Sequence, residues 1–521
     1  MTWHRLILQG LILGRLTIAC VSVNVIWFKR DLRLSDNASV SDAVNRGLPI
    51  ICLFNLDEQR IGRIDVSGIH IEWELDCLRS LAADIEKLGG VIKFNYGNII
   101  EPLEKIHQKY TIDTIIANEE TGLQWSWNRD KLVADWCDFN QVNFVEHHSN
   151  GVIRKLKTRD DWKKHRDKRV SAELFPRPSK LPSPNDIQSD HIPTMQELGL
   201  SSRELTNRPI PGEVAALATL NSFLNERGRN YRKGMSSPIT GEVMCSRISP
   251  YLSAGCLTIK QVFHHTVSRQ RQIKVDPRSA ENRGFTSSLT SFQSRLAWHC
   301  HFMQRLEAEA TMDEIAINPE LDELLNRQLD QRKFIAWRDG KTGWPFFDAC
   351  MRYLTATGWI NFRMRAMLQS VASYTLWLPW QATGTHLANL FMDYEPGIHW
   401  SQVQMQSGVT GINSVRAYSV GKQSTDHDPD GEFIRRWVPE LSGVPAEHIH
   451  EPWLMSQAEQ EQYECRIGID YPEPIVDEKA ARKSGISMSY KAKGDAAVKR
   501  RAKIVFDIHG SRSRQSGRSR N

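Results

Sequence analysis

The chain has 521 residues and a net charge of +6, with 40% hydrophobic and 25% charged residues. This composition is typical of a soluble globular protein with two or three domains, and it excludes a fibrous or wholly disordered chain. The nine cysteines form no CxxC pair and show no metal-ligand spacing. They favour a reduced, cytoplasmic compartment and indicate no metal site.

Residues 1–22 look like a signal peptide only superficially. Arg15 interrupts their apolar stretch, which is too short to span a membrane. We interpret this segment as an extension or a misassigned start, and we expect neither secretion nor membrane association.

Residues 23–150 alternate apolar runs with helical patterns. Strand-like runs occupy residues 23–28, 48–56, 91–97 and 111–120, and helical patterns occupy 38–45 and 70–87. This alternation predicts a doubly wound α/β domain with a parallel sheet. Ligands bind such folds at the carboxyl ends of the strands. That edge would include Asn118, Glu119, Glu120 and Gly122.

Three further segments follow. Prolines between Pro176 and Pro211 rule out long helices, so residues 151–212 are predicted to be an interdomain linker. Helical periodicity without comparable strands predicts a large all-helical domain over 213–480. Residues 481–521 are predicted to be a disordered basic tail, because 482–521 hold twelve Lys or Arg and two acids. Attraction to nucleic acid and simple solubilisation both remain open for this tail.

Large aromatic residues gather beside arginines and acids between Phe346 and Trp437. More than half of the 16 tryptophans follow residue 297. Core packing explains any single tryptophan, but it does not explain clustering beside charge pairs. A flavin between helices needs this mixture, because its ring stacks on apolar groups while its N5 edge and diphosphate need polar ones.

Several long motifs carry a family resemblance. They are WFKRDLRLSDN (27–37), MCSRISPYLSAG (244–255), GKTGWPFFDACMRYLTATGWINFRMR (340–365), MDYEPGIHW (392–400), DPDGEFIRRWVPEL (428–441) and HEPW (450–453). Through them the chain resembles the DNA photolyase/cryptochrome family. The resemblance implies an antenna-type α/β domain, a helical domain that holds FAD, and blue-light chemistry. It also implies an antenna chromophore of folate or deazaflavin type, which these residues do not identify.

The resemblance assigns a set of residues to FAD. They are Tyr231, Cys245, Ser246, Arg247, Ile248, Ser249, Phe292, Arg295, Trp298, Arg365, Asp393, Glu395 and His399. Hydroxyls, free amides and an arginine at a helix start suit a diphosphate, although Ser246 or Ser249 could simply cap that helix. Cys245 stands where the family usually has Thr.

Charged groups are expected at the flavin ring. Arg363 and Arg365 lie on nearly opposite helix faces, so only one can reach a given ligand. The family's motif selects Arg365, paired with Asp393 near N5, and places Glu395 at the ring edge and ribose. His399 replaces the usual Asn, so we predict proton donation to the flavin radical near neutral pH. The alternative is a histidine bonded to a backbone carbonyl.

The resemblance also assigns residues to damaged DNA: Trp298, His299, Phe362, Arg363 and Met405. Trp298 would stack on a flipped pyrimidine dimer. Arg295 replaces an acid that contacts the dimer, Phe362 replaces an Asn, and Met405 replaces a second tryptophan. These side chains can pack on a base, but they lose hydrogen bonds to it.

The electron supply departs from the family's three-tryptophan wire. Only Trp380 matches it, since Val403 and Arg327 occupy the other two positions. Trp377 and Trp380 are three residues apart, so we expect them to touch on one helical face. With Trp400 or Trp359 near the ring, they would form another wire.

Two function classes compete. The first is a photolyase, a carbon–carbon lyase that splits pyrimidine dimers in DNA by light-driven electron transfer. The second is a cryptochrome-type photoreceptor without repair activity. A dark flavin redox enzyme is a third reading, and no hydride-acceptor motif supports it. The sequence does not indicate an oligomeric state.

Overall fold

The computed structural model describes residues 21–156 and 158–510. The expectations for residues 1–20 and for the end of the basic tail, 511–521, lie outside these described residues. Within them, no helix is both long enough and apolar enough to cross a membrane.

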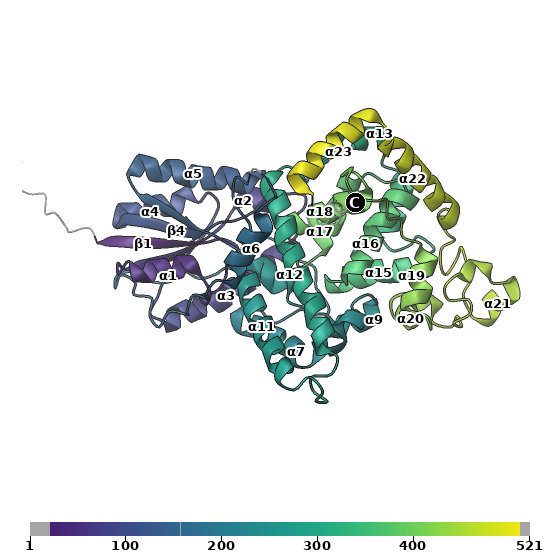
Figure 1. The fold of residues 1–521 in the computed structure, drawn as a ribbon, viewed down its shortest axis with the longest axis horizontal. Helices are drawn as coiled ribbons and strands as arrows, with labels where there is room; N and C mark the ends of the chain where they lie inside the picture. The colour runs from purple at the N-terminus through teal and green to yellow at the C-terminus, as the bar shows by residue number, and fades with distance from the viewer. Residues whose placement is uncertain (1–20, 157, 511–521) are drawn as a thin grey trace, which may run out of the picture.

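The N-terminal domain contains a parallel five-stranded sheet of order β3-β2-β1-β4-β5 (Figure 1). The strands are β1 (Ser22–Phe28), β2 (Ile50–Leu56), β3 (Ile92–Tyr96), β4 (Thr111–Asn118) and β5 (Asn143–His147). The first four confirm the predicted runs. The edge strand β5 was missed, because only two apolar residues stand in NFVEH and none is fully buried.

Helices cover both faces of this sheet. They are α1 (Ala38–Asn45), α2 (Glu58–Ile61), α3 (Gly68–Lys87), α4 (Ile100–Lys109) and α5 (Gln124–Asn140). Ile26 and Phe28 of β1 pack in one core with α1 and α3, whereas Val25 and Trp27 pack in another with α4 and α5. The period of two therefore places alternate residues of one strand in two cores.

The connecting segment 151–212 is mostly irregular, as its prolines predict. It also contains α6 (Trp162–Ser171), which precedes Pro176 and was not predicted. This helix packs against α11 of the helical domain, so the segment is part of the fold and not a free linker.

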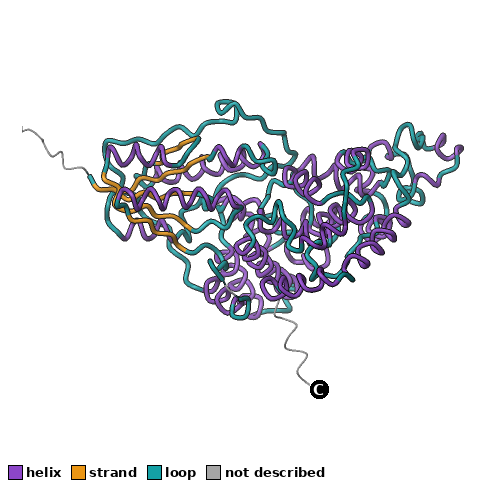
Figure 2. Tube along the Cα trace, turned by 90° about the horizontal axis from the view of Figure 1, so that it is seen from above, coloured by secondary structure: helices purple, strands orange, loops and turns teal. Residues whose placement is uncertain are grey.

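The remaining chain is helical (Figure 2). Its helices are α7 (Glu213–Asn225), η1 (Arg227–Asn230), α8 (Tyr231–Gly234), α9 (Pro238–Met244), α10 (Ser249–Ala254), α11 (Ile259–Val275), α12 (Phe285–Ala308), α13 (Pro319–Leu325), α14 (Gln331–Arg338), α15 (Pro345–Thr357), α16 (Phe362–Ser370), η2 (Val371–Thr375), α17 (Trp380–Leu390), α18 (Pro396–Ser407), α19 (Val420–His427), α20 (Glu432–Trp437), η3 (Pro439–Leu441), η4 (Pro452–Leu454), α21 (Gln457–Gln462), α22 (Glu478–Lys493) and α23 (Ala496–His509).

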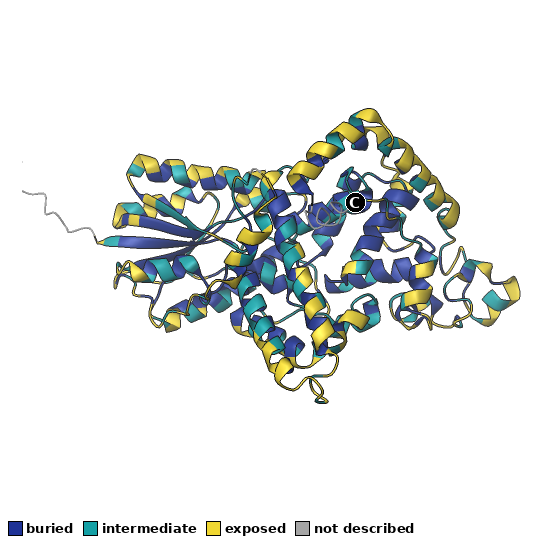
Figure 3. Cartoon of the chain, viewed as in Figure 1, coloured by how far each residue is buried: buried dark blue, intermediate teal, exposed yellow. Residues whose placement is uncertain are grey.

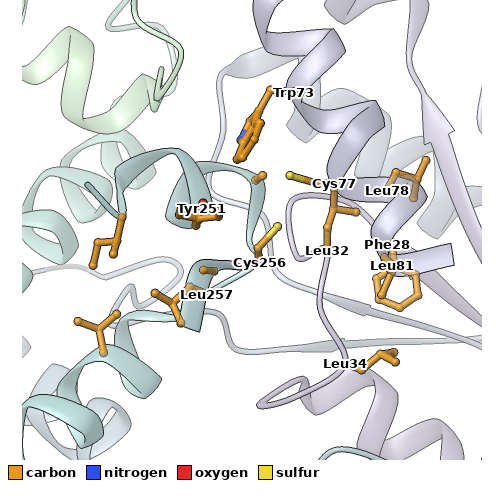
Figure 4. Close-up of a cluster of buried hydrophobic side chains, with 14 of the residues drawn as sticks. Phe28, Leu32, Leu34, Trp73, Cys77, Leu78, Leu81, Tyr251, Cys256 and Leu257 are labelled. Atoms are coloured by element: carbon orange, nitrogen blue, oxygen red, sulfur yellow. The ribbon is translucent and has the colours of Figure 1, made fainter. Parts of the chain in front are cut away.

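One apolar core crosses the boundary between the domains (Figure 4). Trp73 and Cys77 of α3 lie beside Tyr251 of α10 and Cys256 that follows it. The Trp73 indole also donates a hydrogen bond to the Pro250 carbonyl oxygen at 2.9 Å. The start of α10 is therefore fixed by the α/β domain.

The prediction of a disordered tail is wrong for residues 481–510, which form most of α22 and all of α23. Gly485 of α22 packs against the backbone of Tyr374, and Val498 and Val505 of α23 enter the core that contains Trp380. The outer faces of both helices are exposed (Figure 3), and their sequences are rich in lysine and arginine. The basic composition reflects the exposed outer face. The buried face of α22 is narrow and consists of small residues such as Gly485 and Ser489.

Gly485→Ala is expected to destabilise the docking of α22. An added Cβ would lie 2.0 Å from the Tyr374 carbonyl oxygen, and a backbone atom cannot move aside cheaply. Overpacking of this kind costs about 1–3 kcal/mol. Urea unfolding and limited proteolysis within α22 measure the change.

Gly421→Ala is the matched control. Gly421 lies in helix α19, and nothing lies within 4 Å of its added Cβ. This change should stabilise the protein by about 0.5–1 kcal/mol. If Gly485→Ala behaved like Gly421→Ala, the docked position of α22 would be wrong.

Candidate cofactor site and electron-transfer residues

The loop before α10 presents unpaired amides. Arg227 donates hydrogen bonds to the carbonyl oxygens of Cys245 at 2.6 Å and Ser246 at 3.1 Å. Among the described residues, the amides of Ser246 and Arg247 have no acceptor. The Arg247 guanidinium lies 3.9 Å from the centre of the Trp359 ring. Two free amides beside a fixed cation suit a diphosphate.

Helix capping does not explain the serines of this loop. The residue that caps α10 is Ile248, and no side chain makes a capping hydrogen bond there. Burial raises the pKa of the Cys245 thiol to about 11, so this residue is a neutral thiol where the family usually has a hydroxyl.

An aromatic wall stands beside the loop. Phe292 of α12 packs against Phe223 with ring centres 4.7 Å apart, and against Tyr231 at 6.0 Å. Burial raises the pKa of Tyr231 to about 12, and its hydroxyl interacts with the Arg295 side chain. Arg295 therefore lies beside this wall and contributes a positive charge where the family's acid would contribute a negative one.

Arg365 and Asp393 form the predicted pair. Arg365 Nη1 and Nη2 donate to Asp393 Oδ1 and Oδ2 at 2.9 and 2.8 Å, and Nε donates to the Ile360 carbonyl oxygen at 2.8 Å. The guanidinium also stacks 4.1 Å from the Phe391 ring centre. Burial by itself would raise the pKa of Asp393, but Arg365 outweighs burial and holds this pKa below its ordinary value. The cation is thus fixed in one orientation.

Glu395 does not join this pair. Its Oε1 lies 3.3 Å from Nη1 of Arg30, which comes from the α/β domain and also donates to the Ser253 carbonyl oxygen at 2.9 Å. Burial raises the pKa of Glu395 to about 7. Glu395 therefore forms an ion pair between the two domains, and its contact with the flavin edge and ribose stays a prediction. Sequence reasoning missed Arg30, although it stands inside the motif WFKRDLRLSDN.

His399 is a neutral, bonded histidine. Its Nε2 lies 2.9 Å from the Gly384 carbonyl oxygen and donates to it. Burial lowers the pKa of His399 to about 4. Both observations favour the alternative, a histidine bonded to a backbone carbonyl, over proton donation near neutral pH.

The tryptophans lie in a different arrangement from the predicted one. Trp380 and Trp400 are both fully buried, and their ring centres are 6.0 Å apart. Trp377 is not on the same helical face as Trp380, because α17 begins at Trp380 and Trp377 has a φ of 59°. The predicted i,i+3 geometry on one helix is therefore wrong, although Trp377 packs against the cluster that contains Trp380. Trp377 instead stacks on Arg327 at 4.6 Å.

The residues assigned to DNA lie in two places. Trp298 and Phe362 are 47% and 53% exposed, and Arg363 and Met405 are partly exposed. His299 lines a cavity between the two domains, and burial lowers its pKa to about 4. His299 therefore faces the interior, in contrast to its assignment to DNA.

That cavity has a volume of about 310 Å³ and lies at the carboxyl ends of the strands, where the fold predicts a ligand. Asn118 at its edge donates to Asp31 Oδ2 at 2.7 Å, and Glu120 pairs with Arg129 at 2.7 Å. The polar residues proposed for an antenna are thus engaged with other side chains.

The residues around Arg365 fit FAD. They combine unpaired amides, a stacked guanidinium, an aromatic wall and a carboxylate-held cation in one domain. Asn361 Oδ1 and Arg363 Nε are buried there without a partner among the described residues. Sequence reasoning missed Arg227, which orients the loop carbonyls, because nothing in its local sequence distinguishes it from a surface arginine.

Comparisons with known proteins agree with this site. The family model described as "DNA photolyase" matches residues 24–167, and the model for the FAD binding domain of DNA photolyase matches residues 292–491. A cryptochrome DASH of Natronomonas pharaonis is 28% identical over 477 residues, covering 87% of this chain and 98% of the relative. A deoxyribodipyrimidine photo-lyase of Alkalihalophilus pseudofirmus is 27% identical over 492 residues, covering 89% and 97%.

Solved structures share the fold. A bacterial class III photolyase from Agrobacterium tumefaciens superposes with a TM-score of 0.79 at 22% identity, covering 93% of this chain and 100% of that one. An archaeal photolyase from Sulfolobus tokodaii, solved with two FAD molecules, gives 0.70 at 21% identity, covering 90% and 100%. The domain order, the cofactor site and these matches agree. This chain belongs to the DNA photolyase/cryptochrome family, and its helical domain is the FAD-binding domain of that family.

Proposed function

We propose that this protein is a light-dependent DNA photolyase that splits a pyrimidine dimer flipped out of DNA. The observation that carries the proposal is the position of Trp298. It is half-exposed on α12, the helix that also supplies Phe292 and Arg295 to the cofactor site. An exposed indole beside a flavin site is a stacking platform for an extruded base.

Different residues of the site would bind the cofactor and the damaged DNA. Bound FAD supplies the light-driven electron donor. Arg247 and the free loop amides would hold its diphosphate, while Arg365, held by Asp393, would place a positive charge at the ring. Trp298 and Phe362 would hold the extruded bases by stacking. Arg295 would contribute a positive charge toward the DNA backbone or the dimer carbonyls.

A photoreceptor is the second candidate. Arg295, Phe362 and Met405 provide no carboxylate or amide to bind the dimer carbonyls, so dimer recognition here rests on stacking and one cation. Relatives named cryptochrome DASH stand beside those named photo-lyase. The cavity between the domains would suit a second chromophore in either case, as the two FAD molecules of the Sulfolobus tokodaii structure illustrate.

Repair under blue light tests the proposal. The reduced, FAD-loaded protein is mixed with one oligonucleotide carrying a cyclobutane dimer and another carrying a (6-4) photoproduct, with dark controls. We expect light-dependent repair of the cyclobutane dimer. Absence of repair of both lesions, with FAD bound and photoreducible, would assign the protein to the receptor class.

Trp298→Ala is expected to weaken binding of dimer-containing DNA by about 10- to 100-fold, because base–aromatic stacking contributes about 1–3 kcal/mol. Phe139→Ala is the control, since Phe139 is 87% exposed at the end of α5 in the other domain. Fluorescence anisotropy of labelled dimer DNA measures both. Equal affinity of the two variants would contradict a stacking role for Trp298.

A further inference from the structure

A chain of hydrogen bonds leads from Trp400 to the domain boundary. The Trp400 indole Nε1 donates to the Tyr394 hydroxyl oxygen at 2.9 Å. The Tyr394 hydroxyl in turn donates a short hydrogen bond to Asp65 Oδ2, and Arg63 Nε donates to Asp65 Oδ1 at 2.8 Å. Asp65 belongs to the α/β domain and Tyr394 to the FAD-binding domain. Hydrogen bonds therefore link the Trp400 indole to the Tyr394 phenol and the phenol to the Asp65 carboxylate.

We propose that Tyr394 and Asp65 form a proton-coupled electron donor that ends the light-driven path through Trp400. Bound FAD would supply the photo-oxidant, and Trp400 would give up one electron to it. Tyr394 then returns one electron to Trp400, its O–H bond breaks, and the proton passes to Asp65 Oδ2. The products are neutral Trp400, a neutral Tyr394 radical and protonated Asp65, so electrons and protons balance. The inference rests on the light chemistry of the proposed function, but not on DNA repair.

The surroundings suit this step. Trp400 and Asp65 are each 1% exposed and Tyr394 is 9% exposed, so these bonds are shielded from bulk solvent. Burial, and then the negative charge of Asp65, raise the pKa of the Tyr394 phenol well above its ordinary value. The phenol is therefore protonated at neutral pH, and its oxidation requires a base at hydrogen-bond distance. Asp65 is that base: its Oδ2 accepts from the phenol, and its Oδ1 accepts from Arg63 Nε at 2.8 Å.

Trp377 is an electrostatically unfavourable alternative as the final electron donor. Arg327 places its guanidinium 4.6 Å from the Trp377 ring centre, and its three nitrogens have no acceptor among the described residues. An uncompensated cation at this distance raises the energy of a Trp377 radical cation. Trp380 is the remaining competitor, because its indole donates to Asp322 Oδ2 at 3.0 Å.

A small cavity gives the proton a way out. It has a volume of about 40 Å³ and is lined by Asp65 and Tyr394, together with Arg60, His70 and Glu74. At about 10–15 Å³ for each water, it has room for about three water molecules. A proton held on Asp65 can pass to water there, which would prolong the life of the tyrosyl radical.

Radical identity tests the inference without DNA. The oxidised, FAD-loaded protein is illuminated and freeze-trapped for electron paramagnetic resonance, with ring-deuterated tyrosine incorporated in a parallel sample. We expect a neutral tyrosyl signal that narrows on deuteration. In transient absorption, Tyr394→Phe should replace it by a tryptophanyl signal and shorten the radical lifetime at least about tenfold. Asp65→Asn, which keeps an acceptor oxygen but is a far weaker base, should lower the tyrosyl yield.

Tyr471→Phe is the matched control. Its hydroxyl donates to Asp348 Oδ2 at 2.6 Å in a fully buried pair, and among the described residues no tryptophan indole donates to that hydroxyl. Both Tyr→Phe variants lose one buried hydrogen bond to a carboxyl group, but only Tyr394→Phe should change the radical. A tryptophanyl signal in the unaltered protein that Trp380→Phe removes and Tyr394→Phe leaves intact would overturn the inference. A protein that forms the tyrosyl radical but repairs no lesion would support it while refuting the repair proposal.

Discussion

Arg365→Met is expected to abolish tight FAD binding and to lower the free energy of unfolding by about 3–5 kcal/mol. Asp393 is 8% exposed and both of its oxygens accept from Arg365. Removal of the guanidinium leaves this carboxylate buried without a cation. The site also loses the positive charge that would stabilise a reduced flavin ring. Flavin absorbance after gel filtration and urea unfolding of the FAD-free protein measure the two effects separately.

Arg363→Met is the control on the same helix. Arg363 forms no ion pair among the described residues, and its Nε is already buried without a partner. Its removal should leave FAD bound and change stability by less than about 1 kcal/mol. A double variant, Arg365→Met with Asp393→Leu, should recover stability but not FAD binding. If Arg365→Met kept FAD and lost no more stability than Arg363→Met, the pair would have no role at the cofactor.

The second large effect is a loss of stability in acid. Burial lowers the pKa values of five histidines from 6.5 to about 3 or 4: His70, His299, His301, His386 and His399. The unfolded chain therefore binds their protons below pH 6.5, while the folded chain does not. This contribution to stability is present above pH 6.5 and is lost as the pH falls toward 4.

Three buried carboxyl groups oppose this trend. Burial raises the pKa values of Glu395 and Glu307 to about 7 and of Asp348 to about 6, so the folded chain binds their protons first. Their contribution is present at low pH and is lost as the pH rises through these values. Near pH 5.5 these five histidines outweigh these three carboxyls. Counting these eight groups, the unfolded chain binds about two more protons, which corresponds to about 2.7 kcal/mol for each pH unit.

Urea unfolding of the FAD-free protein at pH 5.0, 6.0 and 7.0 measures this slope. His386→Met is the matched variant, because His386 packs on Trp337 and its Nε2 is buried without a partner among the described residues. Removal of this histidine should reduce the slope by about one proton. A stability that is flat or rises as the pH falls from 7.0 to 5.0 would show that the histidines are not buried as described.

Local patterns predicted the elements that have a strong period. Four strands and the helical second domain follow from alternating and 3.6-residue spacing, because each apolar face must be buried. β5 and α6 were missed, since NFVEH has little apolar content and WKKHRDKRVS is polar on most sides. The basic tail was misjudged for a related reason. Docking through Gly485 depends on the absence of a side chain, which composition does not register.

At the candidate cofactor site, too, the sequence predicted some interactions and missed others. The pair of Arg365 and Asp393 was predicted because both residues stand in motifs that the family shares. The interaction partners of Glu395, His399 and Trp377 were not predicted. Each partner depends on a residue that is distant in the sequence or on one backbone angle. Arg30 comes from the other domain, and the Gly384 carbonyl comes from the preceding helix. Trp377 has a φ of 59° and lies just before helix α17, which begins at Trp380.

Contiguous motifs and local periods were sufficient to predict the family, the domain order and the residue types of the cofactor site. Three features follow only from tertiary packing. They are the low pKa of His399, the ion pair of Glu395 with Arg30, and the hydrogen bonds that link Trp400 through Tyr394 to Asp65. Burial and distance set pKa values and electron partners, and both arise only when helices distant in the chain pack together.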